Sequence, residues 1–217
     1  MIKSDRTHWG SLVKAFHWTI VLLLIAQGTI GLIMVELPRK PGVIAVYSFH
    51  KSLGLTILAL ALLRLAWRAL DPRPDEPASM PRWQVLAARA GHALLYGLLF
   101  AVPLSGWWFD SVSALRPLYW FGLFEVPHLT GADKAMKDVA ADTHAALFWI
   151  LFLVAAGHAG IAVIHQFINR DNVLGRMWPA SLQRRPRTAT PESAHVTTNP
   201  LPPAAAAEPD LRARDRA

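Results

Sequence analysis

Four long stretches of apolar residues dominate the chain, at residues 16–37, 46–67, 85–109 and 143–168. Each is as long as the roughly 20 apolar residues that a helix needs to cross a bilayer, and Pro103 in the third is tolerated as a kink in a membrane helix. Polar residues collect between the stretches. The pattern therefore predicts an all-α integral membrane protein, a four-helix bundle whose helices run alternately up and down.

The segments outside these stretches have a different composition. The first stretch follows polar residues and is as long as a full span, so it predicts a membrane helix and not a cleavable signal peptide. From Ser181 onward the chain is rich in Pro, Ala, Thr and Arg, which is typical of a disordered segment. We expect a four-helix transmembrane domain at 1–180 and a disordered Pro/Ala/Arg-rich cytoplasmic tail at 181–217.

Basic residues are distributed unevenly between the two sides of the membrane that these spans define. They flank the apolar stretches and form no patch with interleaved aromatic residues, so the net charge of +7 indicates membrane orientation and not nucleic-acid binding. The bias places both termini in the cytoplasm. On that side the basic residues include Lys3, Arg6, Lys14, Arg68, Arg73, Arg82, Arg89, Arg170, Arg176, Arg184, Arg185 and Arg187, and on the other side they are Arg39, Lys40, Lys51, Arg116, Lys134 and Lys137.

The chain contains nine histidines and no cysteine. The absence of cysteine excludes thiolate-bound iron–sulfur clusters, covalent c-type haem and disulfides. An ionisable side chain inside a membrane span is costly and is therefore a candidate functional residue. Because imidazole is a common axial ligand of haem iron, the histidines in the apolar stretches are candidate haem ligands.

Four histidines fall at two matching depths. His17 and His158 lie near the cytoplasmic side, and His50 and His144 lie near the outer side. The 14 residues from His144 to His158 rise about 21 Å and make nearly four turns, so both side chains share one helix face. We expect two pairs, His17 with His158 and His50 with His144, each joining two helices as a haem between helices of a bundle requires.

Other residues at similar depths have more than one interpretation. Arg64 is on nearly the same face as His50 but near the cytoplasmic side, where it would bind a haem propionate or extend to the interface. Arg68 is expected to extend to the interface. Lys51 is a weaker candidate for contact with an outer propionate or an anionic reactant.

Two further histidines lie near the cytoplasmic pair. His92 would either replace His17 or His158 as a ligand, or line the haem pocket or a quinone site. His165 follows His158 by seven residues and therefore lies on the same face. It is a candidate for contact with a quinone or a propionate.

Glycines on the same faces are small enough to leave room for a macrocycle. Gly28 and Gly31 lie near the face of His17. The alternative is ordinary small-residue packing between membrane helices. The other glycines open to these two interpretations are Gly54, Gly106, Gly157 and Gly160.

An ordered set of short motifs, covering about residues 6–180, resembles the bacterial cytochrome b561 family. It is this order along four spans that is specific, because each motif alone is weak. The motifs are Phe16-His17-Trp18, His50-Lys-Ser-Leu-Gly54, Leu63-Arg64-Leu-Ala-Trp-Arg68, Gly91-His92, Asp142-Thr-His144, Gly157-His158, Ile164-His165 and Asp171-Asn172-Val-Leu-Gly-Arg176-Met177.

The resemblance implies a cytochrome of the bacterial inner membrane with two b haems. It carries over His17, His50, His144 and His158 as the axial ligands, from the first, second and fourth helices. It also implies electron transfer between quinone and a partner, and some members are similar to superoxide oxidases that reduce ubiquinone.

The expected function is one-electron transfer across the membrane, between an unidentified partner on the periplasmic side and the quinone pool. Bis-histidine ligation leaves no open iron position, which favours electron transfer over oxygen binding. The alternatives are a standalone superoxide:ubiquinone oxidoreductase, a b-type cytochrome anchor subunit of a hydrogenase or dehydrogenase, and a membrane protein without haem. The outer loop at 117–137 is predicted to be a docking surface or a lid on the membrane interface.

Overall fold

A computed structural model describes residues 1–6, 8–38, 40–75, 80–113, 116–169 and 173–178. These residues belong to one compact unit, which extends from Met1 to Gln183. The tail predicted at 181–217 lies outside the described residues, so its predicted disorder stays a prediction.

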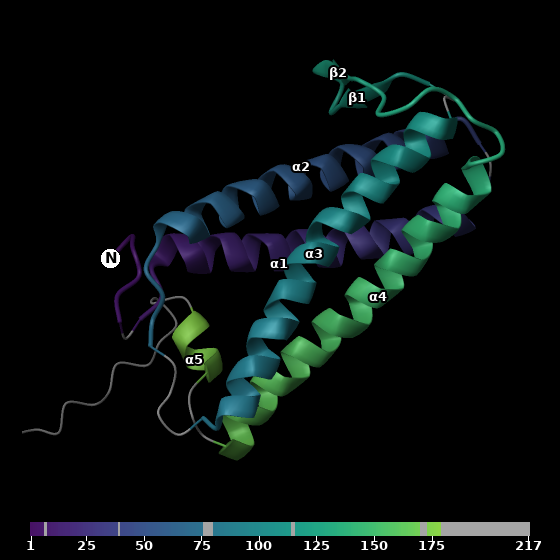
Figure 1. Cartoon of the computed structure of the whole chain (residues 1–217). Coiled ribbons are helices and arrows are strands. Elements are labelled where there is room, and N and C mark those ends of the chain that lie inside the picture. Colours follow the sequence, from purple (N-terminus) through teal and green to yellow (C-terminus); the bar gives the residue numbers. More distant parts are fainter. Residues whose placement is uncertain (7, 39, 76–79, 114–115, 170–172, 179–217) are drawn as a thin grey trace, which may run out of the picture. The chain divides into compact units, whose positions relative to one another are not determined.

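Four long helices form the body of this unit (Figure 1). All four are long and apolar enough to cross a membrane, which confirms the prediction of a multi-pass membrane protein. Each begins before its apolar stretch, because interfacial residues continue the helical hydrogen bonding. The helices are α1 (Ser11–Glu36), α2 (Val43–Leu70), α3 (Arg82–Ser113) and α4 (Lys137–Ile164).

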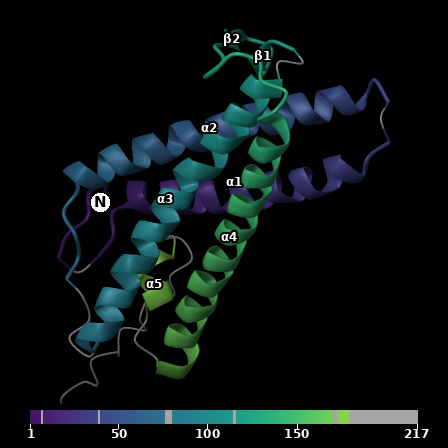
Figure 2. The same ribbon diagram turned by 45° about the vertical axis from the view of Figure 1, so that its right-hand side comes forward.

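Helices that are neighbours in sequence are also neighbours in space. Helix α1 packs on α2, α2 on α3, and α3 on α4, and Figures 1 and 2 show α1 running beside α2 and α3 beside α4. The bundle therefore has two ends. At one end, which we call the N-terminal end, α1 and α3 begin and α2 and α4 end. At the other end α2 and α4 begin and α1 and α3 end; we call it the hairpin end, because a β-hairpin described below lies there.

The packed interior is small, and much of the apolar surface faces outward. Ile20, Ile57 and Leu99 form a buried cluster that joins α1, α2 and α3. By contrast, Leu22 is 65% exposed and Leu153 is 67% exposed. An outer surface of large apolar side chains is suited to lipid and would be unfavourable in water.

A β-hairpin, which the sequence pattern did not predict, covers the hairpin end. Strands β1 (Leu118–Trp120) and β2 (Phe124–Val126) pair antiparallel. Phe121 and Gly122 have positive φ angles of 47° and 75°, as a tight turn between paired strands requires. The Phe121 N–H donates to Ser52 Oγ of α2 at 2.9 Å, so the hairpin is fixed to the bundle.

Helix α4 changes geometry at its end. It continues as a π-helix, η1 (His165–Asn169), where a regular helix was predicted to residue 168. The short helix α5 (Val173–Met177) follows. Trp18 Nε1 of α1 donates to Met177 O at 2.9 Å, so α5 is fixed against the N-terminal end.

Candidate cofactor site

The four predicted ligand histidines lie in two ring pairs, one near each end of the bundle. His17 of α1 faces His158 of α4, with 6.5 Å between ring centroids and 72° between ring planes. His50 of α2 faces His144 of α4, with 6.4 Å and 88°. We call these the N-terminal pair and the hairpin pair. The structure thus brings together the residues that the 14-residue spacing had matched.

The separation within each pair suits one metal ion between two imidazoles. Imidazole–metal bonds are about 2 Å long, so an ion bound by one nitrogen of each ring would hold the centroids roughly 6.4 Å apart. The described residues contain no group of three or more His, Asp or Glu that could hold a metal ion. Two imidazoles supply two ligands, so each pair suits a metal that brings further ligands of its own, as haem iron does.

His92 is placed differently. Its ring centroid lies 5.3 Å from that of His158, with 66° between the planes. That separation is shorter than the roughly 6.4 Å expected for two imidazoles on opposite sides of one ion, whereas the separation of His17 and His158 matches it. The geometry favours His17 over His92 as the partner of His158.

The hairpin pair is oriented by hydrogen bonds from α3. His144 Nδ1 lies 3.0 Å from Val102 O and 3.0 Å from Ser105 Oγ. A hydrogen on Nδ1 is donated to the carbonyl, which leaves Nε2 as the free lone pair for a metal. Gln27 Nε2 of α1 donates to His50 O at 2.9 Å. This hydrogen bond fixes the backbone of His50, the other residue of the hairpin pair.

Two glycines give the hairpin-pair imidazoles their space. A Cβ at Gly106 would lie 2.9 Å from His144 Cε1, and one at Gly31 would lie 3.1 Å from His50 Cε1. Both distances are shorter than ordinary contacts, so any side chain there would displace a ring. The sequence left this space to a macrocycle or to helix packing, whereas in the structure the His50 and His144 rings occupy it.

The other glycines have different surroundings. A Cβ at Gly28 would meet the Phe148 ring at 3.2 Å, and one at Gly54 would meet Gln27 Nε2 at 3.2 Å. No described atom lies within 4 Å of a Cβ built at Gly157 or Gly160. The space beside Gly28 and Gly54 is therefore taken by the side chains of Phe148 and Gln27.

All four helices contribute to the surroundings of the N-terminal pair. Arg64 of α2 places Nη2 3.3 Å from His17 Nδ1, and its guanidinium lies 5.5 Å from the ring centroid of Tyr96 of α3. Sequence reasoning missed Tyr96, although its position four residues after His92 places both side chains on one helix face. His165 begins η1 at the same end.

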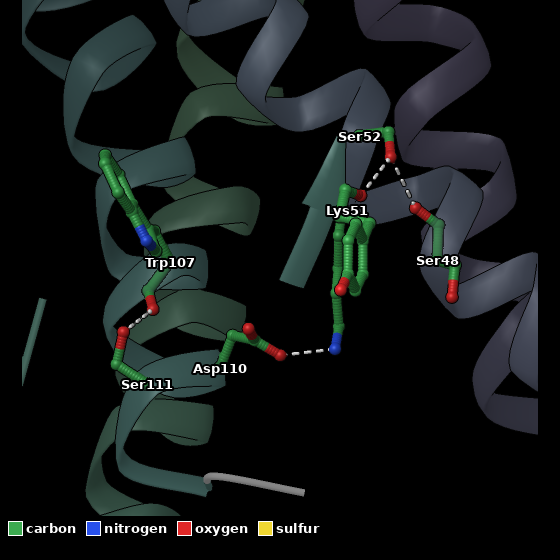
Figure 3. A network of polar contacts seen from close by, with 7 residues as sticks. Ser48, Lys51, Ser52, Trp107, Asp110 and Ser111 are labelled. Carbon is green, nitrogen blue, oxygen red and sulfur yellow. Dashed lines mark hydrogen bonds and ion pairs between the residues drawn. The ribbon is translucent and has the colours of Figure 1, made fainter. Parts of the chain in front are cut away.

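The hairpin end also contains an ion pair close to His50. Lys51 Nζ contacts the Asp110 carboxylate of α3 (Figure 3), and the Asp110 side chain is only 7% exposed. Lys51 was expected to meet a propionate or an anionic reactant, whereas the structure satisfies its charge within the protein. The missed residue is Asp110, and its signal was a carboxylate directly after a long apolar stretch.

Comparison with known proteins identifies the family of the chain. The chain matches the family described as Prokaryotic cytochrome b561 over residues 8–180, which includes all four helices. Cytochrome b561 homolog 2 of Escherichia coli (strain K12) is 34% identical over 170 residues, which cover 78% of this chain and 90% of that protein. Probable superoxide oxidase CybB of Yersinia pestis is 29% identical over 175 residues, covering 79% and 96%. Cytochrome b561 homolog 1 of Escherichia coli (strain K12) is 30% identical over 131 residues, covering 60% and 73%.

Proposed function

Because the chain belongs to the prokaryotic cytochrome b561 family, which implies b-type haem, we propose that it holds two such haems and carries single electrons across the membrane. The observation that supports two sites is the presence of two histidine ring pairs with centroid separations of 6.5 Å and 6.4 Å. Each has the separation that one metal ion between two imidazoles requires. His17 and His158 would hold one haem, and His50 and His144 the other.

The bound haem would supply an iron that gains and loses one electron. The chain's own residues fix where that exchange happens. His144 and His158 are 14 residues apart on α4, which corresponds to about 21 Å of helix rise. One site would thereby lie near each face of the bilayer, and the two histidines of each pair would hold the haem iron and leave no position open for oxygen.

We place the N-terminal end of the bundle at the cytoplasmic face of the bacterial inner membrane, because basic residues concentrate there. A quinone would bind at that end. The His92 ring contacts His158, and an imidazole can hydrogen-bond a quinone oxygen. His165 and Arg64 are the other candidates for this contact. An unidentified partner would exchange electrons at the hairpin end.

The proposal is tested by a reduced-minus-oxidised optical spectrum and haem quantitation on the purified full-length protein. We expect two b haems per chain and no covalently attached haem. Protein purified with haem supplied during expression that still contained none would overturn the proposal. A measured value of one haem per chain would mean that only one of the two proposed sites binds haem.

A second candidate function is superoxide:ubiquinone oxidoreductase activity by this chain alone. It is favoured by the relative named probable superoxide oxidase, which aligns over 96% of its length. Each superoxide would give up one electron and leave as dioxygen, and ubiquinone would take up two electrons and two protons. Superoxide-driven ubiquinone reduction by the purified chain tests this, whereas a catalytic subunit that co-purifies would indicate a membrane anchor instead.

A further inference from the structure

The last turns of α2 carry three buried N–H groups that have no hydrogen-bond acceptor within the described parts of the chain. They are Arg64 Nε, Trp67 Nε1 and Arg68 Nη1. Buried polar atoms are nearly always hydrogen-bonded in folded proteins. Guanidinium and indole N–H groups only donate, so the partner that all three lack is an acceptor.

These donors lie close together and are held in place. Arg64 and Arg68 are one helical turn apart and Trp67 lies beside them, so they share one region of the helix surface. The Arg64 guanidinium stacks on Tyr96 at 5.5 Å, and the Arg68 guanidinium stacks on Trp9 at 4.6 Å. Aromatic rings from α3 and from the segment before α1 thus fix both cations. Arg68 was expected to extend to the interface, and this stays a prediction; the structure adds its contact with Trp9.

Neither guanidinium is paired directly with a carboxylate of the described residues. Among the described residues, no Asp or Glu forms a salt bridge with Arg64 or Arg68. Asp71, the nearest acid along the chain, attracts Arg68 electrostatically, but its printed hydrogen bonds are accepted from Ser4 N and Ser4 Oγ and it forms no salt bridge with either arginine. Two like charges held near each other favour an anion between or beside them.

The contact between Arg64 and His17 does not supply the missing acceptor. When a neutral imidazole binds a metal through Nε2, Nδ1 carries the hydrogen and becomes a donor. Arg64 Nη2, 3.3 Å from His17 Nδ1, would then face another donor. Metal binding at His17 would therefore leave Arg64 with a second unsatisfied N–H.

We propose that Arg64, Trp67 and Arg68 form a binding site for an anionic oxygen group, a carboxylate or a phosphate. Arginine suits both, because its planar guanidinium can donate two parallel hydrogen bonds. A carboxylate would be a propionate of the haem at the N-terminal pair, and this source rests on the proposed function. A phosphate would be the headgroup of an anionic phospholipid, and this source does not.

The experiment uses the purified full-length protein and the variants Arg64→Gln, Arg68→Gln and Trp67→Phe. Arg82→Gln is the matched control, because Arg82 is exposed at the first turn of α3. One measurement is the rate at which haem transfers from each variant to excess apomyoglobin. The other is the retention of added phosphatidylglycerol, followed by native mass spectrometry in a neutral detergent.

If the site holds a propionate, haem from the N-terminal pair transfers about tenfold faster in either arginine variant, since a charge-assisted hydrogen bond is lost. Lipid retention is then unchanged. If the site holds a phosphate, phosphatidylglycerol binds about tenfold more weakly in the same variants and haem transfer is unchanged. Trp67→Phe keeps an aromatic ring and removes one N–H. It should therefore change whichever of the two measurements the arginine variants change, but by a smaller factor.

Arginine variants that match Arg82→Gln in both measurements would overturn the proposal. Arginine-dependent lipid binding in a protein without haem would support the site and overturn the proposed function. Variants that lose their helical circular dichroism are excluded, and Trp67→Phe then decides between the outcomes.

Discussion

The two histidine pairs have nearly the same ring separation but opposite surroundings. At the hairpin end, His144 Nδ1 has acceptors within α3, and Lys51 is neutralised by Asp110. At the N-terminal end, Arg64 and Arg68 keep buried donors without acceptors among the described residues. The comparison teaches that ring separation decides whether a metal fits, whereas neighbouring charges decide how the two sites differ.

The charge difference has a consequence for the direction of electron flow. Uncompensated positive charge near a redox centre favours the state with one more electron, so it raises the reduction potential. Arg64 lies 3.3 Å from a histidine of the N-terminal pair, and together with Arg68 it would keep a net positive charge there even with one anion bound. The cation beside the hairpin pair is instead neutralised by Asp110. We expect electrons to move from the hairpin end towards the N-terminal end, where the quinone is proposed to bind.

The largest expected effect comes from removing one histidine of either pair. His158→Ala should remove the haem of the N-terminal pair, and His144→Ala that of the hairpin pair. Each variant should keep about half of the haem, because a single remaining imidazole holds a b haem weakly. The measurement is the haem-to-protein ratio, together with a redox titration that identifies the haem that remains.

Two further histidine variants serve as controls for this prediction. His128→Ala, in the exposed loop at the hairpin end, should keep both haems. His92→Ala should also keep both, because its 5.3 Å separation from His158 is shorter than two imidazoles on opposite sides of one ion require. Loss of one haem in His92→Ala but not in a His17→Ala variant would show that His92, and not His17, is the ligand that pairs with His158.

The helices and the histidine pairing could be predicted from sequence because both depend on local periodicity. An apolar stretch of membrane-spanning length is a sufficient signal for a span. Two residues 14 apart share a helix face whatever the packing around them. The pairing of His50 with His144 then needed only the alternating direction of the helices.

The surroundings of the pairs could not be predicted, because they depend on contacts between segments far apart in the chain. Nothing in the sequence assigns Asp110, rather than another acid, to Lys51. Arg68 at a helix end is typical of a side chain that extends to the interface, and only the fold places Trp9 over it. The hairpin at 118–126 was missed because each strand has only three residues.

A smaller effect is expected from a methyl group that disturbs only the hairpin pair. A Cβ at Gly106 would lie 2.9 Å from His144 Cε1, and the ring has little freedom to move because Nδ1 is held by Val102 O. Such overpacking costs about 1–3 kcal/mol, so Gly106→Ala should weaken haem binding at this pair roughly 5- to 150-fold. Haem loss on dilution, followed optically, measures this.

Gly97→Ala is the matched control in the same helix. A Cβ at Gly97 has no described atom within 4 Å, so both haems should stay bound. Each substitution replaces a helical glycine and gains up to about 1 kcal/mol of helix propensity. The two variants therefore differ mainly in the contact with His144, and equal haem affinities would disprove this role of Gly106.

The smallest effect, and the most direct test of the comparison, is expected from making the hairpin end resemble the N-terminal end. Asp110→Asn leaves Lys51 without its counterion. The loss of stability should be about 1–3 kcal/mol, less than for a fully buried pair, because the Lys51 side chain is 33% exposed. Thermal unfolding in detergent measures this.

The same variant should narrow the difference between the two reduction potentials. A unit charge about 10 Å from a redox centre shifts its potential by on the order of 50–100 mV at an effective dielectric constant of about 20. The potential of the hairpin-pair haem should therefore rise, while that of the other haem stays constant. A combined Lys51→Met, Asp110→Leu variant removes both charges and should return the potential towards its original value. If Asp110→Asn left both potentials unchanged, neighbouring charge would not be what distinguishes the two sites.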